Sequence, residues 1–215
     1  MDVVAALDVI RNRIADAGGA VDHVQVLAVT KGQSVACVEA ALAAGLVDIG
    51  EDRAQELVAK ADAVEAGPRW HFIGQLQRNK VRSVAHLVHL WQSVDRLRLG
   101  EEISRRAPGA SVLVEVNLTD DPARGGAQPG LVPGLVEGLR DLGLDVDGLM
   151  AVGRRGPRVE VSAGFRLVRD LADQLGLPTR SMGMSEDLEL AVQEGSTMVR
   201  VGSGLFGPRA YPRPG

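Results

Sequence analysis

The sequence predicts an α/β fold, a single (β/α)8 barrel with an extra N-terminal helix, over residues 1–215. Short apolar runs rich in valine alternate with segments whose apolar residues recur at helical spacing, which is typical of parallel βα units. Eight such runs favour a closed barrel. A doubly wound open sheet is the alternative architecture. The length of 215 residues suits one large domain, and no linker-like stretch divides it.

The elements are expected to alternate along the whole chain. The first is an amphipathic helix over 3–17, where Leu7, Ile10 and Ile14 recur at helical spacing and Gly18-Gly19 ends the pattern. Strands are expected at 25–31, 47–51, 70–74, 87–94, 111–117, 146–152, 179–182 and 197–201. Helices are expected at 34–44, 53–65, 79–85, 96–106, 131–142, 160–175 and 186–194, with Ser34 and Asp95 as caps. Because only a short tail follows the last strand, the first helix is expected to complete the outer ring.

Composition excludes several classes of protein. A net charge of −4 shows no general footprint for nucleic acid, and the single Cys37 excludes an internal disulfide and a multi-cysteine metal site. The first residues lack a signal peptide's basic start and apolar core, and no apolar run reaches membrane-spanning length. We therefore expect a cytoplasmic monomer that binds neither membrane nor nucleic acid. RNA binding by the basic cluster Arg78, Lys80 and Arg82 is the alternative to a solvated helix face.

Lys31 ends the first predicted strand, Val26-Leu27-Ala28-Val29-Thr30-Lys31. A parallel α/β fold places its chemistry at the carboxyl ends of its strands. Burial against apolar walls disfavours the charged form of an amine, and the free amine condenses with a carbonyl to give a Schiff base. The alternative is a lysine that merely reaches solvent from the end of a strand.

Small and hydroxyl residues follow the last two predicted strands. Ser185 stands at the start of a predicted helix, and the glycine-rich stretch 202–207 includes Gly202 and Ser203. Backbone N–H groups in such turns can cradle a phosphate, and barrels place this site after strands seven and eight. The alternative is an ordinary pair of turns.

Arg200 alternates with Val199 and Val201, which would point it into the barrel. An unpaired buried guanidinium is costly, so it needs an acceptor. A pyridine ring nitrogen is one candidate, which an always-charged arginine would keep unprotonated. An ion pair with Glu51 or Asp52 is the alternative.

Several blocks of the chain match a known family. They are residues 27–31, 50–51 with 55–56, 70–74 with 76–77 and 79–80, 93–95, 148–151, 181–185, and 195–200 through 206–207. On these blocks the chain resembles the pyridoxal phosphate homeostasis proteins (the YggS-like family) over nearly its whole length. The resemblance implies a barrel similar to the N-terminal domain of alanine racemase.

The same resemblance implies which residues hold the cofactor. Pyridoxal 5′-phosphate would form a Schiff base with Lys31, Ser185 and the Gly202-Ser203 backbone would contact its phosphate, and Arg200 would lie near its ring nitrogen. The family usually has asparagine where this chain has Asp52, so Asp52 is the candidate contact there. Met184, from the same turn as Ser185, completes the candidate set.

A racemase using this cofactor needs a second base opposite the lysine. Tyr211, in the tail, is the only tyrosine. His71 could serve as a base, with a hydrogen-bonded core histidine as the alternative. We therefore predict a protein that holds pyridoxal 5′-phosphate and delivers it to apo-enzymes that depend on it, rather than an enzyme. The alternative is a racemase-like enzyme of low activity.

Overall fold

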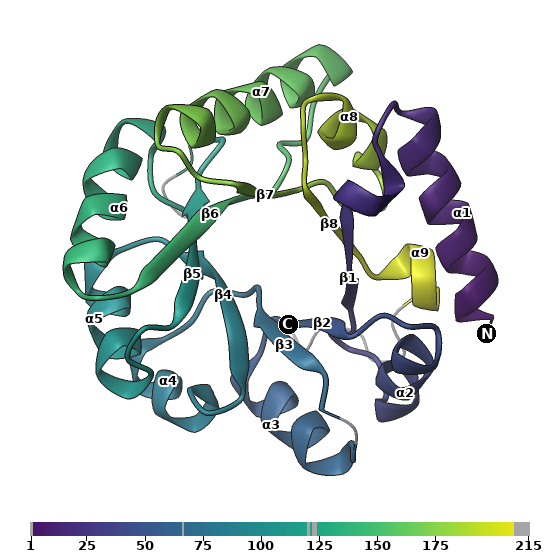
Figure 1. Ribbon diagram of the computed structural model, residues 1–215, viewed down its shortest axis with the longest axis horizontal. Helices are drawn as coiled ribbons and strands as arrows, with labels where there is room; N and C mark the ends of the chain where they lie inside the picture. Colours follow the sequence, from purple (N-terminus) through teal and green to yellow (C-terminus); the bar gives the residue numbers. More distant parts are fainter. Residues whose placement is uncertain (1, 66, 120, 122–123, 209–215) are drawn as a thin grey trace.

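Eight parallel strands close into a barrel in chain order, and β8 pairs with β1 to complete the ring (Figure 1). The computed structural model describes residues 2–65, 67–119, 121 and 124–208. The strands are β1 (Gln25–Val29), β2 (Asp48–Glu51), β3 (Arg69–Phe72), β4 (Val88–Val94), β5 (Ser111–Val116), β6 (Asp145–Ala151), β7 (Thr179–Met182) and β8 (Met198–Val201). The predicted (β/α)8 barrel is confirmed, and the open doubly wound sheet is wrong.

Helices form a ring outside the strands (Figure 1). They are α1 (Val3–Asp16), α2 (Val35–Ala43), α3 (Ala54–Ala63), α4 (Arg78–Val84), α5 (Leu97–Arg106), α6 (Val132–Asp141), α7 (Arg158–Gln174), α8 (Leu188–Gln193) and α9 (Ser203–Phe206). Two 3-10 turns, η1 (Val21–His23) and η2 (Pro129–Leu131), precede β1 and α6. The stretch after the last strand thus begins with a short helix, α9, rather than a plain tail.

The N-terminal helix occupies a place in this ring, as predicted. Helix α1 packs against α8 and α9 and lies between α8 and α2 in the end-on view (Figure 1). Its Leu7, Ile10 and Ile14 side chains are buried, since their helical spacing puts them on one face. The Asp2 side chain accepts a hydrogen bond from the Ala5 N–H (3.0 Å) and caps the helix.

The side chains of each strand alternate between an outward and an inward face. The helices cover the outward face, and side chains from the other strands cover the inward face. The outward face packs under the helices in one large apolar cluster, to which Val26 and Ala28 of β1 belong. The inward face forms a smaller apolar cluster inside the barrel, which consists of Leu27, Val29, Leu90, Leu113, Met150 and Met198. Burial on both faces explains why strands such as β1 and β5 read as nearly continuous apolar runs in the sequence.

Several element boundaries differ from the predictions by one or two residues, as in β1, which ends at Val29 rather than at residue 31. Two of the differences have a clear cause. Asp95 does not cap the helix that follows it: α5 begins at Leu97, and the Asp95 carboxylate pairs with the Arg96 guanidinium. Helix α8 begins at Leu188 instead of residue 186, because the preceding residues form a tight turn. In that turn the Asp187 carboxylate accepts the Met184 N–H (2.6 Å), which keeps 184–187 outside the helix.

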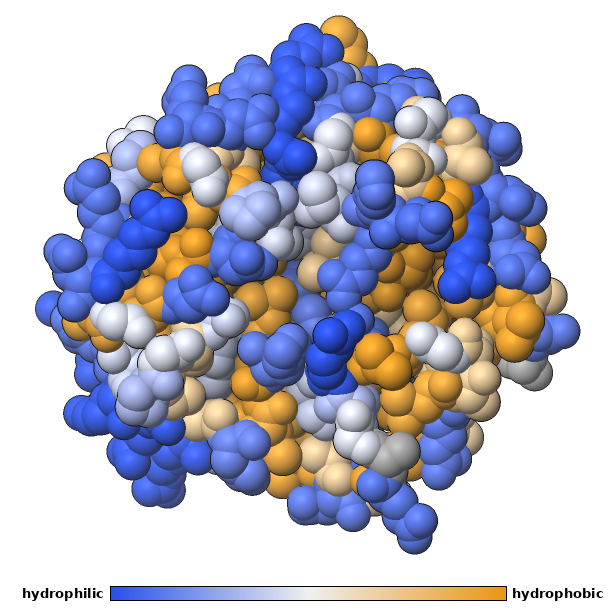
Figure 2. All heavy atoms as spheres, viewed as in Figure 1, coloured by the Kyte–Doolittle hydropathy of each residue, from blue (hydrophilic) through white to orange (hydrophobic). Residues whose placement is uncertain are grey.

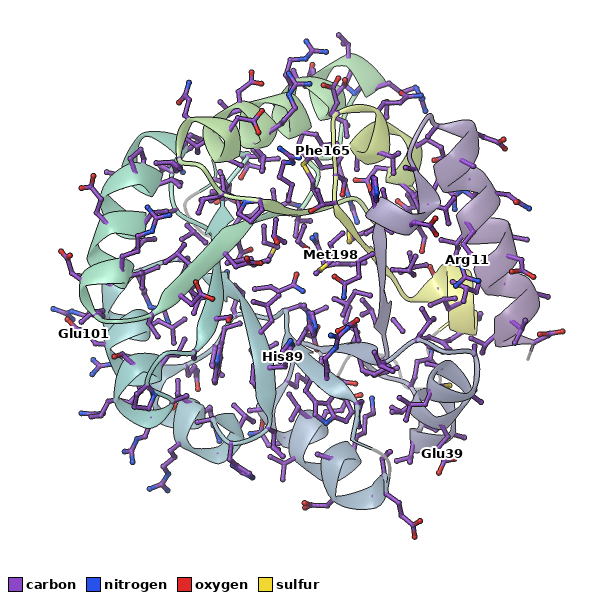
Figure 3. All side chains as sticks on the ribbon, in the orientation of Figure 1. Arg11, Glu39, His89, Glu101, Phe165 and Met198 are labelled. Atoms are coloured by element: carbon purple, nitrogen blue, oxygen red, sulfur yellow. The ribbon has the colours of Figure 1, made fainter. Side chains whose placement is uncertain are left out.

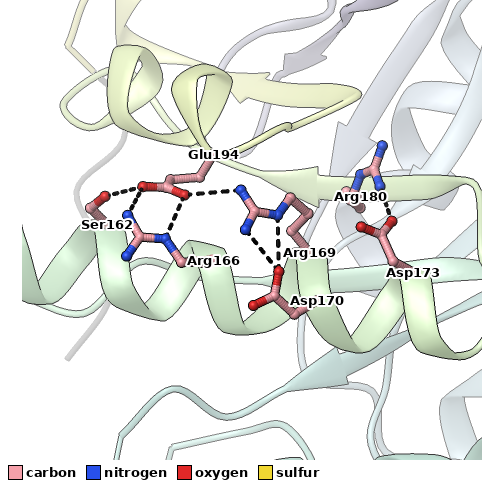
Figure 4. A network of polar contacts seen from close by, with 7 residues as sticks. All are labelled: Ser162, Arg166, Arg169, Asp170, Asp173, Arg180 and Glu194. Carbon is pink, nitrogen blue, oxygen red and sulfur yellow. Dashed lines mark hydrogen bonds and ion pairs between the residues drawn. The ribbon is translucent and has the colours of Figure 1, made fainter.

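Helix α7 is fastened to the end of α8 by a polar network (Figure 4). Glu194 accepts hydrogen bonds from Ser162, from Arg166 (2.8 Å to Oε1) and from Arg169 (3.3 Å to Oε2). The Arg166 hydrogen bond is the main reason that the pKa of Glu194 lies below its ordinary value. This network holds the outer layer beside β7 and β8.

One face of the molecule, seen along the barrel, carries both polar and apolar side chains (Figure 2). In the end-on view, hydrophilic side chains gather over the middle of the barrel, with apolar patches between them (Figure 2). None of the helices within the described residues is long and apolar enough to cross a membrane.

Candidate functional site

Lys31 lies in the turn that follows β1, two residues beyond the end of the strand. Gly32 follows it at φ +67°, a left-handed conformation that favours glycine. The Lys31 Nζ lies 3.4 Å from Asp52 Oδ2, and the two side chains are 26% and 20% exposed. The amine is therefore at the rim, accessible to a ligand and paired with a carboxylate from the next strand's turn.

A buried network fixes the backbone on both sides of Lys31. The Lys60 ammonium donates to the Thr30 carbonyl (2.6 Å), to Glu51 Oε1 (2.6 Å) and to Glu56 Oε1 (2.7 Å). Glu56 Oε1 also accepts the Gly32 N–H (2.7 Å). Because Lys60 and Glu51 lie beneath the helix layer, this network anchors the turn that carries Lys31 from below.

Glu51 lies away from the rim, beneath the turn that carries Lys31. Its side chain is fully buried, accepts the Thr30 hydroxyl (2.5 Å) and pairs with Lys60. Burial raises the pKa of Glu51 to about 7, although the Lys60 charge opposes the rise. Its role is structural, since its oxygen Oε1 holds the end of β1.

Hydroxyl and backbone groups form a cradle after β7 and β8. The Ser203 Oγ lies 3.3 Å from Ser185 Oγ, which also accepts the Gly204 N–H (3.2 Å). These three groups are exposed and close together, as the sequence predicted for Ser185 and Ser203. Met184 lies in the same turn and is 36% exposed.

Gly202 connects this cradle to the strand that carries Lys31. A Cβ at Gly202 would lie 3.1 Å from the Val29 carbonyl oxygen, and one at Gly204 would lie 3.3 Å from Ser185 Oγ. The backbone after β8 therefore runs close beside the end of β1. Gln33 adds a second link, because its Nε2 donates to the Gly207 carbonyl (3.4 Å).

Arg200 points into the barrel, as predicted. Its Nη1 donates to the Ser181 carbonyl (2.6 Å) and Oγ (2.9 Å), and its Nη2 donates to the Ala151 carbonyl (2.8 Å). A guanidinium has five N–H bonds. The other two, on Nε and Nη2, have no hydrogen-bond partner among the residues that the structure describes.

The predicted alternative partners of Arg200 bind lysines instead. Glu51 pairs with Lys60, and Asp52 pairs with Lys31. Burial lowers the pKa of Arg200 to about 10, so the guanidinium remains charged at neutral pH. A buried cation with two uncommitted donors is suited to a ligand that brings a hydrogen-bond acceptor.

Glu115 is a candidate site residue near Arg200 that the sequence did not predict. It alternates with Leu113 on β5, which places it inside the barrel on the side of Arg200. Burial raises the pKa of Glu115 to about 7, Asp95 adds to the rise, and the Arg200 charge opposes it. The only sequence signal was a carboxylate at an inward position of an apolar strand.

His71 is a hydrogen-bonded core residue. It is 2% exposed, its Nε2 lies 3.0 Å from Asp48 Oδ1, and its Nδ1 lies 2.8 Å from Gln92 Nε2. Both ring nitrogens are thus engaged inside the barrel. Tyr211, the other residue considered as a base, lies outside the described residues.

A closed barrel with a lysine after its first strand and a cluster of hydroxyl and backbone N–H groups after its last two defines the class of the alanine racemase N-terminal domain. The sequence model of that domain matches residues 6–210. The chain is 39% identical to the pyridoxal phosphate homeostasis protein of Pseudomonas aeruginosa, over 95% of this chain and 93% of that one. It is 33% identical to the Escherichia coli protein of the same name, over 99% of both. The chain belongs to the family of pyridoxal phosphate homeostasis proteins.

Solved structures show the same relationship. PipY of Synechococcus elongatus, determined with pyridoxal phosphate bound, superposes with a TM-score of 0.79 at 33% identity and covers 92% of this chain and 100% of that one. An alanine racemase of Clostridium difficile superposes with a TM-score of 0.76 at 16% identity, covering 99% of this chain and 57% of that one. This second likeness shows a shared fold.

Lys60→Met should destabilise the protein by about 3–5 kcal/mol, because it leaves the Glu51 carboxylate buried without its cation. Denaturant unfolding followed by circular dichroism measures this change. Lys80→Met, on α4, is the matched control and should change the free energy of unfolding by less than about 0.5 kcal/mol. Equal free energies of unfolding for the two variants would show that the buried network does not stabilise the fold.

Proposed function

We propose that this chain binds pyridoxal 5′-phosphate as a Schiff base on Lys31, holds it in the cytoplasm, and passes it to apo-enzymes that depend on it. The observation that carries the proposal is the seam between β8 and β1. There the Lys31 amine, the cradle of Ser185 and Ser203, and the Arg200 guanidinium come from adjacent segments. The structure of the relative PipY with pyridoxal phosphate bound supports this proposal.

The groups at the seam match the chemistry of this cofactor one by one. The aldehyde requires an amine, and Lys31 is at the rim while Lys60 is held by three acceptors beneath it. The phosphate requires hydroxyl and N–H donors, which Ser185, Ser203 and Gly204 offer. The pyridine nitrogen requires a donor, and Arg200 has two N–H bonds that find no partner in the described part of the chain. Glycine at 202 and 204 leaves the backbone open to an anion.

The choice of arginine beside a pyridine nitrogen favours holding over catalysis. A guanidinium is always charged and donates a hydrogen bond without giving up its proton. It would therefore keep the ring nitrogen unprotonated, and an unprotonated pyridine is a poorer electron sink than a pyridinium. The bound cofactor would then give little support to carbanion chemistry.

Lys31→Ala should abolish the absorbance band at the edge of the visible range that a Schiff base gives. The wild-type protein incubated with pyridoxal 5′-phosphate should show the band, and borohydride should convert it to a stable reduced adduct. Lys80→Ala is the matched control, because the chain has three lysines and Lys60 is buried. A band that persists in Lys31→Ala and disappears in Lys80→Ala would overturn the assignment.

Asp52→Asn should speed formation of the Schiff base at neutral pH. In the Lys31–Asp52 pair the amine is an ammonium, which must lose a proton before it attacks an aldehyde. A partly exposed ion pair contributes about 0.2–1 kcal/mol, so the rate should rise by at most about fivefold. Stopped-flow absorbance after mixing with pyridoxal 5′-phosphate measures the rate. A slower reaction would mean that Asp52 assists the amine.

We further propose that the chain is not an amino-acid racemase. The His71 ring nitrogens both have partners inside the barrel, so no histidine from β3 is free to act opposite Lys31. This proposal competes with a racemase-like enzyme of low activity.

Incubation of the loaded protein with L- or D-alanine in deuterated water should leave the α-proton in place. Nuclear magnetic resonance of the recovered amino acid measures the exchange. Sustained exchange that Lys31→Ala abolishes would establish the enzyme instead.

A further inference from the structure

A single chain of hydrogen bonds crosses the barrel interior from Arg200 to Asp48. Arg200 Nη1 donates to Ser181 Oγ (2.9 Å), and Ser181 Oγ donates to Gln92 Oε1 (2.7 Å). Gln92 Nε2 donates to His71 Nδ1 (2.8 Å), and His71 Nε2 lies 3.0 Å from Asp48 Oδ1. The five residues come from five strands, β8, β7, β4, β3 and β2.

All five side chains are buried, and the hydrogen bonds between them all run in the same donor-to-acceptor direction. An amide N–H only donates, so His71 Nδ1 accepts from Gln92 and the ring proton resides on Nε2. That proton is donated to Asp48. Every link therefore runs from donor to acceptor, starting at the Arg200 guanidinium and ending at a carboxylate. In a buried chain of this kind each bond polarises the next, so a change at one end reaches the other.

Asp48, at the end of this hydrogen-bond chain, is fixed by two further donors. Asp48 Oδ2 accepts from Arg69 Nη2 (2.6 Å) and Gln25 Nε2 (2.5 Å). Burial alone would raise the pKa of Asp48, but the hydrogen bonds from His71, Arg69 and Gln25 lower it to about 2. The carboxylate thus stays charged and fixed.

The His71 end of this chain lies at the mouth of the barrel opposite Lys31. A hollow of about 740 Å³ opens there, with His71 among its lining residues. The His89 ring lies 5.9 Å from that of His71, and both His89 and Met198 are seen inside the ring of strands (Figure 3). The other charged or titratable groups around the hollow are Asp22, His23, Arg69, Asp145 and Asp147.

We propose that His71 and Gln92 are positioning residues, which hold Arg200 in place for the cofactor ring through the buried chain of hydrogen bonds. The inference rests on the proposed function, because it assigns Arg200 to the ring nitrogen of pyridoxal 5′-phosphate. His71 and Gln92 act only through Ser181 and Arg200.

The positioning role follows from the direction of these hydrogen bonds. His71 Nδ1 accepts from the Gln92 amide nitrogen, which turns the amide oxygen toward Ser181, and this oxygen accepts the Ser181 proton. Without an acceptor at Nδ1 the Gln92 amide would be free to turn over. Ser181 would then lose the acceptor of its own proton, which weakens its alignment with Arg200.

Binding of pyridoxine 5′-phosphate tests this inference apart from Lys31, because its alcohol cannot form a Schiff base. Gln92→Leu should weaken its binding by about fivefold at pH 8, the effect of one broken buried hydrogen bond. Ser181→Ala, which breaks the chain next to Arg200, should weaken it similarly. Isothermal titration measures the dissociation constants, and circular dichroism verifies that each variant is folded.

A conservative substitution separates positioning from a general structural role. The oxygen of His71→Asn can accept from Gln92, so its dissociation constant should stay within about twofold of the wild-type value. His71→Leu, which offers no acceptor, should weaken binding by about fivefold. His89→Leu, in the same hollow but outside the hydrogen-bond chain, is the matched control and should keep the wild-type affinity.

Two results would overturn the inference. One is wild-type affinity in both Gln92→Leu and Ser181→Ala, and the other is equal affinity of His71→Asn and His71→Leu. Failure of the wild type to bind pyridoxal 5′-phosphate at all would instead contradict the proposed function. Intact Schiff-base formation on Lys31 together with either overturning result would contradict this inference alone.

Discussion

Closure of the barrel between β8 and β1 is the constraint on which the site depends. Leu27 pairs with Arg200 and Ala28 with Val201 in the parallel register, so segments from opposite ends of the chain become neighbours. The close approach of Gly202 to the Val29 carbonyl then carries the backbone of the cradle past the end of the first strand. An open sheet would leave the lysine at one edge and the cradle at the other.

The alternation of side chains along the strands divides the polar residues into two supporting sets. On the outward side, the Lys60 side chain of α3 meets Glu51 of β2, and together they fix the backbone around Lys31. On the inward side, Ser181 and Gln92 engage Arg200 within the barrel. Each polar set replaces apolar packing and is stable only because nearly all its members are hydrogen-bonded. The two charged groups of the site are thus held from opposite faces of the sheet.

The fold and the outline of the site could be predicted because they depend on local patterns. Valine-rich runs marked the strands, and Lys31, Ser185 and Ser203 stood at their carboxyl ends. The supporting residues could not be predicted, since Lys60 and Gln92 are ordinary members of a helix and a strand until the barrel closes. The alternative ion pair of Arg200 with Glu51 was wrong, because the direction of the Glu51 side chain depends on a register that only the structure shows.

A crystal structure of the chain with pyridoxal 5′-phosphate tests the central claim most directly. The account predicts continuous density from Lys31 Nζ to the cofactor, with its phosphate on Ser185 and Ser203 and its ring nitrogen facing Arg200. A phosphate bound at the opposite mouth of the barrel, or a Schiff base on Lys80, would contradict it.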